Sequence, residues 1–253
     1  MKKFTSCKES IKNCTENKYF SIAHLHTDEE TMSIHIHDCY EVYYSISGGK
    51  QFLIDNKLYD ISPGDLFVIN QFESHYVSQI NKTIHERIII SIHPDVLKSI
   101  STSKTNLSYC FTHRTGNFSH KFALNKENQN RFIYFINKIT SAEGFGSDMI
   151  EYSSFIELMI YLNKVFVDNN DSLVAPYKYN NQIQEIITYI NDNVKNKYIT
   201  ARRISIAKSL LLNGSSINDV YVNCGFNDYS NFLKSFKKAV GISQKKYSTF
   251  IMN

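Results

Sequence analysis

The sequence predicts an α+β chain with an antiparallel β-barrel first, a helical hairpin next and an all-α domain last. Three observations predict this order. Short β-branched and aromatic runs with close turns fill residues 20–100, and apolar residues recur at helical spacing after about residue 105. The charge also changes sign: residues 1–175 carry 17 Lys and Arg against 20 Asp and Glu, and residues 176–253 carry 11 against 4. At 253 residues, the chain is long enough for two domains with cores of their own.

The β-rich part is predicted to span residues 15–105. The run HIHDCYEVYYSISGG (35–49) alternates in polarity and ends at the turn signal Gly48–Gly49. The run KQFLIDNKLYDIS predicts a hairpin with Asp55–Asn56 at its bend, and PGDLFVIN and HERIIISI predict two further strands. Many short strands with closely spaced turns are typical of an antiparallel sandwich or barrel.

Two amphipathic helices are predicted in the helical region 106–170. Their apolar positions follow the spacing i, i+3, i+4 and i+7: Phe132, Phe135, Ile136 and Ile139, then Ile150, Phe155, Leu158 and Leu162. Gly144 and Gly146 separate the helices, which should therefore pack antiparallel. We expect residues 125–168 both to pack internally and to form a homodimer interface. Residues 171–181 are polar around a proline and form the predicted linker.

The segment 182–253 predicts an all-α domain with a helix-turn-helix. A helix with one apolar face is followed by RRISIAKSLLL, which Gly214 ends. Two short helices come next, with the start, turn and end signals Ser216-x-x-Asp219, Gly225, Asp228 and Gly241. The positive charge of this segment suggests a polyanionic partner, although charge alone does not identify that partner.

Composition and missing motifs narrow the class of protein. No apolar run reaches the roughly 18–20 residues of a membrane span, and the start lacks the apolar core of a signal peptide. Five scattered cysteines without a C-x-x-C motif suggest a reducing cytoplasm. The sequence has no Walker loop, no G-x-G-x-x-G and no G-x-S-x-G, so it offers no support for phosphate or serine-nucleophile chemistry.

A cluster of chemically active side chains is predicted on the first of these strands. If residues 35–41 form a strand, His35, His37, Cys39 and Glu41 point to one side. Such a face could hold a metal, catalyse a reaction or bind a small molecule. His24 and His26 repeat the His-x-His pattern one strand earlier and could reach the pocket mouth; His85, His93, His113 and His120 have no organising spacing and are assigned to surface or structural positions.

The basic end resembles a known family. In the last helix-turn-helix, Phe232 and Phe236 face inward at i,i+4. The stretch GFNDYSNFLKSFKKAVGIS resembles the signature of AraC-family transcription regulators, and RRISIAKSLLL resembles the helix that links the family's two helix-turn-helix units; the match covers residues 202–250. The resemblance implies base contacts from Tyr229, Ser230, Leu233 and Lys234, and DNA-backbone contacts from Asn227, Asn231, Lys237 and Lys238.

This chain departs from the family pattern at several positions. Tyr221, Gln244 and Ser248 stand where Ala, Pro and Arg are usual. The family also carries a first helix-turn-helix of roughly 30–40 residues, where here Thr200 runs directly into Ala201. Either that first unit is deleted or a segment is missing from the sequence. A deletion would put specific DNA binding in doubt, because each lost groove contact removes phosphate and base interactions.

The β-rich half resembles a cupin, the barrel that AraC-type proteins use as a sensor. His35, His37, Glu41 and Gly48 match the first cupin motif at every spacing; Gly64–Asp65 and His75 fit the second, with Asn70 where Pro is usual. In metal-binding cupins, residues matching His35, His37, Glu41 and His75 hold a divalent ion. Three interpretations stay open: a metal pocket, a metal-free effector pocket, which we favour, or a structural polar cluster. Cys39 could be a ligand or a redox switch, but is more simply inert packing.

Together these observations predict a cytoplasmic transcription regulator and not an enzyme. Its barrel senses a small-molecule effector, and residues 182–253 bind promoter DNA as part of a homodimer, without membrane contact. The rival hypothesis is a metal-dependent cupin enzyme, a dioxygenase or isomerase, with an accessory basic domain. A third possibility follows from the absent segment: a regulator that heterodimerises and does not bind DNA itself.

Overall fold

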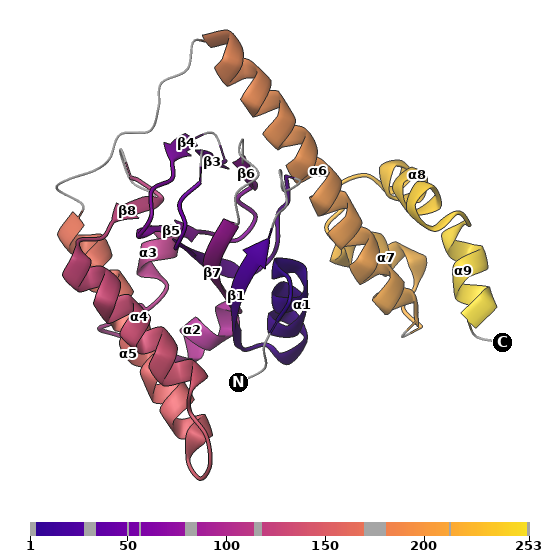
Figure 1. The fold of residues 1–253 in the computed structure, drawn as a ribbon. Helices are drawn as coiled ribbons and strands as arrows, with labels where there is room; N and C mark the ends of the chain where they lie inside the picture. The colour runs from indigo at the N-terminus through magenta and orange to yellow at the C-terminus, as the bar shows by residue number, and fades with distance from the viewer. Residues whose placement is uncertain are drawn as a thin grey trace. The chain divides into compact units, whose positions relative to one another are not determined.

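The structure, a computed structural model, describes residues 4–27, 34–49, 51–55, 57–78, 85–113, 118–169, 181–212 and 214–251. The chain divides into two compact units, Met1–Thr188 and Tyr189–Asn253, which we describe separately (Figure 1). Among the described residues, no helix is long and apolar enough to cross a membrane. The linker predicted at 171–181 lies almost wholly outside the described residues.

A five-stranded antiparallel sheet forms the centre of the first unit. Its strands lie in the order β1-β7-β2-β5-β8. They are β1 (Phe20–Thr27), β7 (His85–Ile92), β2 (Tyr40–Ser45), β5 (Asp65–Ile69) and β8 (Lys121–Ala123). Because β8 pairs with β5, the sheet extends beyond residue 105, the predicted end of the barrel.

A second, three-stranded sheet has the order β4-β3-β6. The strands β3 (Gln51–Ile54) and β4 (Lys57–Asp60) form the hairpin predicted from Asp55–Asn56, and Asp55 has the positive φ of 53° that a tight turn demands. The strand β6 (His75–Ser78) pairs with β3, and an isolated bridge joins His35 to His75. The described pairings form two sheets and not a closed barrel, so the confirmed fold is a cupin-like pair of antiparallel sheets.

Strand alternation separates two cores. Along β7, the even positions Ile88, Ile90 and Ile92 pack in one cluster, whereas Ile89 packs in the other. The first cluster lies between the large sheet and the helices. The second lies between the two sheets and includes Tyr43, Phe52, Tyr59, Phe67 and Val77. A side chain's parity therefore decides whether it faces the inter-sheet space or the helices.

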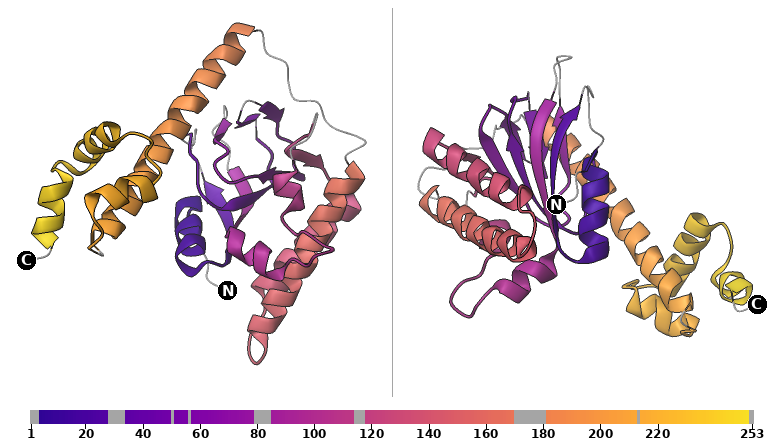
Figure 2. Two further views of the ribbon diagram at one scale, coloured as in Figure 1. Left: turned by 180° about the vertical axis from the view of Figure 1, so that it is seen from behind. Right: turned by 60° about the horizontal axis from the view of Figure 1, so that its bottom comes forward.

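Helices cover both sides of the large sheet (Figure 2). On one side lie α4 (Lys126–Thr140) and α5 (Ser147–Asn169), which pack against each other as predicted through Phe132, Phe135, Leu158 and Leu162. The short helices α2 (Pro94–Ile100) and α3 (Tyr109–Thr112) add Leu97 and Phe111 to the same core.

On the opposite side, α1 (Cys7–Asn17) packs on β1 and β7. Ser6 starts this helix by accepting a hydrogen bond from the Glu9 amide. Its buried face consists of Cys7, Ser10 and Cys14, so the helix presents small polar groups and thiols to the inter-sheet space.

The second unit is helical, as predicted. It contains most of α6 (Asn181–Leu212), then α7 (Ile217–Asn223), α8 (Tyr229–Val240) and α9 (Gln244–Ile251). Ile204, Val220, Phe232 and Phe236 are part of its core. Helix α6 continues without interruption through Thr200 and Ala201. The described residues therefore contain a single helix-turn-helix, α7–α8, and residues 201–212 extend the preceding helix.

Candidate functional site

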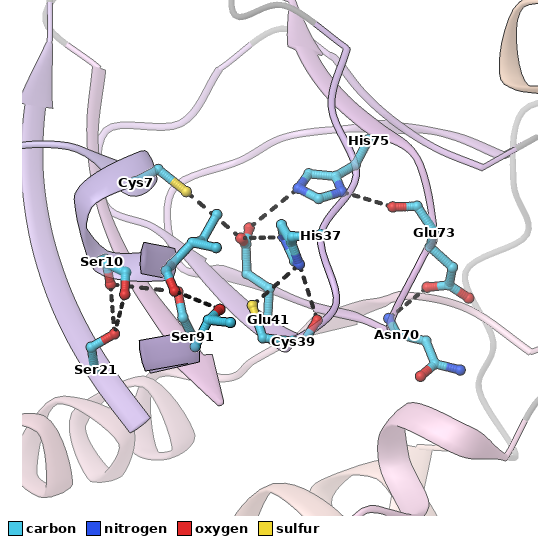
Figure 3. Close-up of polar contacts among 12 residues, drawn as sticks. Cys7, Ser10, Ser21, His37, Cys39, Glu41, Asn70, Glu73, His75 and Ser91 are labelled. Atoms are coloured by element: carbon cyan, nitrogen blue, oxygen red, sulfur yellow. Dashed lines mark hydrogen bonds and ion pairs between the residues drawn. The ribbon is translucent and has the colours of Figure 1, made fainter. Parts of the chain in front are cut away.

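The predicted cupin ligands come together in the inter-sheet space. His35 lies on the isolated bridge to His75 at the start of β6, and Glu41 is the second residue of β2. One ligand nitrogen from each of His35, His37 and His75 lies within 4.8 Å of the others. Glu41 contacts two of these rings, with 3.1 Å from Oε2 to His37 Nε2 and 3.8 Å from Oε1 to His75 Nε2. We call these four residues the sensor cluster; Figure 3 shows His37, Glu41 and His75 of this cluster.

The local backbone differs from the predicted strand. Residues 36–39 are irregular, and β2 begins only at Tyr40. This bend turns the backbone so that His37 Nδ1 donates a hydrogen bond to the Cys39 carbonyl at 3.0 Å, with Cys39 Sγ 3.3 Å away. Cys39 therefore contacts Nδ1 of His37, and Glu41 contacts Nε2. A hydrogen bond with Cys14, together with burial, raises the pKa of the Cys39 thiol strongly, which favours the inert packing role.

Burial and mutual contact fix the charges of the sensor cluster. Burial alone would raise the pKa of Glu41, but His75 and His37 outweigh it and lower the pKa to about 2. Burial opposes protonation of His37, yet its hydrogen bonds with Cys39 and Glu41 raise its pKa well above the usual range. Burial and the nearby His35 lower the pKa of His75 to about 3. The cluster thus contains a buried imidazolium–carboxylate pair beside a neutral imidazole.

One nitrogen of this cluster lacks a hydrogen bond. His75 Nδ1 bonds to the Glu73 carbonyl at 3.0 Å, which directs the lone pair of Nε2 toward Glu41. Although His75 is only 2 % exposed, its Nε2 makes no hydrogen bond to any residue that the structure describes. A histidine that binds a metal through one ring nitrogen usually donates a hydrogen bond from the other, often to a backbone carbonyl. Both His37 and His75 make such a bond through Nδ1. Three imidazoles and a carboxylate with this support fit a divalent Fe, Mn, Ni or Zn ion.

The sequence prediction missed the polar groups around the sensor cluster. The Cys7 thiol of α1 approaches Glu41 Oε2 at 3.8 Å, and Ser10 bonds to Ser21 at 2.9 Å. On β7, His85 and Arg87 are each only 2 % exposed. Their odd parity with Ile89 was the signal that could have located them, because it places them between the sheets.

Two of the histidines without an organising spacing, His85 and His120, are buried, so of the two predicted roles, surface or structural, they have the structural one. His85 is buried and hydrogen-bonded to the Tyr43 hydroxyl. His120, 1 % exposed, bonds through Nδ1 to the Tyr59 hydroxyl at 2.9 Å and through Nε2 to Glu73 at 3.2 Å. Each histidine therefore forms a hydrogen bond with a buried tyrosine, and neither is a surface residue.

His24 and His26 do not reach the pocket. They occupy even positions on β1, whereas their neighbours Ala23 and Leu25 pack in the inter-sheet core. Both imidazoles are exposed and contact Glu86 instead. The expectation of a pocket-mouth position was therefore wrong, because the His-x-His spacing specifies a shared face but not which face.

The predicted DNA-contacting residues lie on and just before α8. Asp228 starts this helix by accepting a hydrogen bond from the Asn231 amide at 2.6 Å, and Gly241 ends it at a φ of 84°. Seven of the eight residues are exposed: Asn227, Tyr229, Ser230, Asn231, Lys234, Lys237 and Lys238. Leu233 differs, because it is only partly exposed and packs on the core of the unit.

Two departures from the family pattern have a structural role. Gln244 is 3 % exposed, and its amide donates to the Leu233 carbonyl at 3.1 Å, so it joins α9 to α8 where the family has Pro. Tyr221 stacks edge-on with Tyr229, with ring centroids 5.3 Å apart. Both residues therefore contact α8.

Comparison with known proteins identifies both units. Residues 17–130 match the family model "AraC-like ligand binding domain", and residues 196–249 match "Helix-turn-helix domain". A curated relative is the uncharacterized HTH-type transcriptional regulator YbfI of Bacillus subtilis (strain 168), 26 % identical over 225 residues, which cover 78 % of this chain and 80 % of the relative.

Solved structures of ToxT from Vibrio cholerae align along most of the chain. The structure of ToxT with a bound unsaturated fatty acid is 14 % identical, with 92 % of this chain and 95 % of that chain covered and a TM-score of 0.41. Another ToxT crystal form is 11 % identical, with 93 % and 100 % covered and the same TM-score. Superposition at this level does not bear on function, so the assignment rests on the two family models and on the curated relative. This chain belongs to the AraC family of transcription regulators.

Proposed function

We propose that a small molecule bound at the sensor cluster controls how the exposed face of α8 engages promoter DNA. The two matched domains, one for ligand binding and one with a helix-turn-helix, support a regulator and not an enzyme. The observation that carries the proposal is the buried His37–Glu41 pair beside the His75 nitrogen that lacks a hydrogen bond. A polar cluster of this kind in an otherwise apolar core can recognise a hydrogen-bonding ligand, because an unsatisfied buried polar group costs free energy.

The chemistry of α8 supports the DNA-binding half of the proposal. Its exposed face combines the hydroxyls of Tyr229 and Ser230 and the ammonium group of Lys234, which suit base edges, with Asn231, Lys237 and Lys238, which suit the DNA backbone. Its opposite face is fixed to the core by Phe232 and Phe236, both fully buried. Side chains on a rigid helix can enter the major groove without an ordering cost. The single helix-turn-helix in the described residues would then contact one groove segment per protomer.

A second copy of the chain would supply the other contact. Along α5, Met149, Ile160 and Val167 are 65 %, 39 % and 54 % exposed. Their spacings of 11 and 7 residues place them on one stripe of the helix. Ile160 and Val167 also line a hollow of about 590 Å³ with Leu107 and Tyr109. We infer that this stripe and hollow, within the predicted region 125–168, form the homodimer interface.

The two modules can be coupled by a population shift. An effector that binds one arrangement of the dimer more tightly than the other moves the equilibrium toward it. We place this activity in the cytoplasm, because all five cysteines are free, buried thiols.

A metal at the sensor cluster is the second candidate, favoured specifically by His75 Nε2. His35, His37, His75 and Glu41 would hold the ion, which would supply a Lewis-acidic centre for an oxygen- or nitrogen-bearing effector. In that case this chain's own contribution is to orient the rings through the carbonyls of Cys39 and Glu73. Metal analysis of protein purified without chelators, compared with a His37→Ala variant, distinguishes this alternative from the metal-free pocket.

DNA binding is tested by fluorescence anisotropy with the promoter fragment upstream of the gene, at several salt concentrations. We expect tight binding at low salt and, for Lys237→Ala at an expected DNA-backbone contact, weaker binding with a salt slope reduced by about one. Lys12→Ala is the matched control, because this lysine lies on α1 in the other unit and is also exposed. No binding by the wild type at low salt, or an equal effect of Lys12→Ala, would contradict the proposal.

The interface is tested by analytical ultracentrifugation. Ile160→Lys places a charge in the centre of the stripe and should convert a dimer into a monomer. Asp148→Lys, which also alters an exposed position on α5, should leave the dimer intact. A wild type that sediments as a monomer at high concentration would rule out the interface.

A further inference from the structure

A second histidine cluster lies outside the sensor cluster, on the outer face of the large sheet. His24 Nε2 is 2.7 Å from Glu86 Oε1, and His26 Nε2 is 3.3 Å from the same oxygen. The two imidazole centroids are 4.9 Å apart. One ligand atom from each of the three residues lies within 4.8 Å of the others. We call His24, His26 and Glu86 the surface triad.

The fold positions these groups without help from any loop. His24 and His26 are two residues apart on β1, so both point to the same face of the sheet. The register of β1 with β7 places His26 directly opposite Glu86 and His24 opposite Ile88. Directly opposite side chains on an antiparallel pair lie close enough to share a ligand. Two imidazoles and a carboxylate are therefore held on paired strands, which are more rigid than a loop.

The donor set and its spacing suit a particular class of ion. Zn²⁺ binds imidazole and carboxylate at about 2.0–2.2 Å, which places tetrahedral ligands roughly 3.3 Å apart. The His26–Glu86 separation already equals this value, and the His24–Glu86 separation is slightly shorter. The histidine side chains are 52 % and 56 % exposed, so water can complete the coordination and the ion has an entry path. A hard ion such as Mg²⁺ would prefer an all-oxygen site.

We propose that the surface triad binds one divalent late transition metal ion, Zn²⁺ or its neighbours Ni²⁺ and Cu²⁺, independently of the sensor cluster. Bound there, the ion joins β1, the edge strand of its sheet, to β7. His26 precedes His35 by nine residues, so the ion fixes the strand end from which the chain continues to the sensor cluster. Metal binding at the surface triad would thereby restrict the start of the segment that leads to His35 and His37 of the sensor cluster.

The test is calorimetric titration of the full-length, tag-free protein with Zn²⁺ alone. Loss of an outer partner weakens a metal site by about 10–100-fold, so loss of a ligand should weaken it by at least about tenfold. We therefore expect His26→Ala to lose one binding event or to weaken it by this factor, and Glu86→Gln to weaken it in the same direction. Both positions are on the surface, and circular dichroism checks that the variants fold.

Two comparison variants make the result specific. His75→Ala removes a sensor-cluster ligand and should leave zinc binding at the surface triad unchanged. If zinc bound only at the sensor cluster, His75→Ala would lose zinc binding and His26→Ala would keep it. His93→Asn removes a histidine that faces a carboxylate, Asp95, at 3.7 Å without a second imidazole, while asparagine can still start α2. Equal binding by wild type and His26→Ala, or an equal loss with His93→Asn, would overturn the proposal.

Discussion

The two units of this chain use charge in opposite ways. The sensor unit buries a carboxylate, an arginine and several histidines between its sheets, so their interactions are fixed by their neighbours. The DNA-binding unit buries mainly apolar side chains and keeps the lysines of α8 exposed. Buried ionic groups are costly to disturb, whereas exposed ones are worth little to stability and remain available to a partner. The comparison predicts where a substitution should affect folding and where it should affect only binding.

The largest effect is expected from Glu41→Ala in the sensor unit. Removing this carboxylate leaves the His37 imidazolium buried without its partner, which costs about 3–5 kcal/mol. Chemical denaturation followed by far-ultraviolet circular dichroism measures the loss, and hydrogen exchange over β2 assigns it to the sensor unit. Glu157→Ala, at an exposed carboxylate paired with Lys138, is the control and should change stability by less than about 1 kcal/mol. Similar losses of unfolding free energy in Glu41→Ala and Glu157→Ala would contradict the predicted difference between buried and exposed charges.

A smaller effect is expected at the start of the recognition helix. Asp228→Ala removes the acceptor for the Asn231 amide and should cost the DNA-binding unit about 0.5–2 kcal/mol. Asp228→Asn keeps an acceptor and should recover most of this loss. Hydrogen exchange of α8 amides is the measurement; unchanged exchange in Asp228→Ala would show that the helix start does not depend on this side chain.

The pH dependence of the sensor unit should include a contribution from His85. Burial and the charge of Arg87 lower the pKa of His85 to about 4, below its ordinary value near 6.5. The folded protein therefore takes up this proton less readily than the unfolded chain, and stability should fall as the pH drops from about 6.5 to 4. Thermal unfolding across this range should show a shallower decline for His85→Gln than for the wild type. A wild-type curve that rises toward pH 4, or an unchanged slope in the variant, would contradict the assignment.

The smallest effect on stability is expected for exposed lysines of α8. Lys237→Ala and Lys238→Ala should each change the free energy of unfolding by no more than about 0.5 kcal/mol, because both side chains are exposed. The same variants should still weaken DNA binding in the anisotropy assay. A large loss of stability would mean that these lysines have a structural role that their exposure does not suggest.

Sequence patterns predicted most of the elements, because period and turn chemistry are local. The α4–α5 hairpin and the α7–α8 pair follow from apolar spacing and from Gly225, Asp228 and Gly241. The pairing of β8 with β5 could not be predicted, since three residues after a long connection carry little signal. The sensor-cluster residues were brought together as expected, although their functional role stays a prediction.

Histidines show the limit of sequence prediction most clearly. The His-x-His pairs at 24–26 and 35–37 have the same spacing, yet one faces outward and the other faces the inter-sheet space. Facing direction depends on strand register against neighbours that are distant in sequence, as the β1–β7 register shows. His85 and Arg87 were missed for a related reason: their shared parity with Ile89 places all three on one face of β7, but the pairing with distant strands decides that this face lies between the sheets.

The unbroken course of α6 through Thr200 and Ala201 bears on how much sequence information one protomer can extract from a promoter. A single DNA-contacting helix specifies only a few base pairs, and so short a base sequence occurs by chance at many places in a genome. In the proposed homodimer, two protomers would specify about twice as many base pairs, and the distance between the two half-sites would be a further constraint. The protein would then distinguish DNA sites by half-site spacing as much as by base sequence. Changing that spacing would abolish binding to an operator without altering a contacted base.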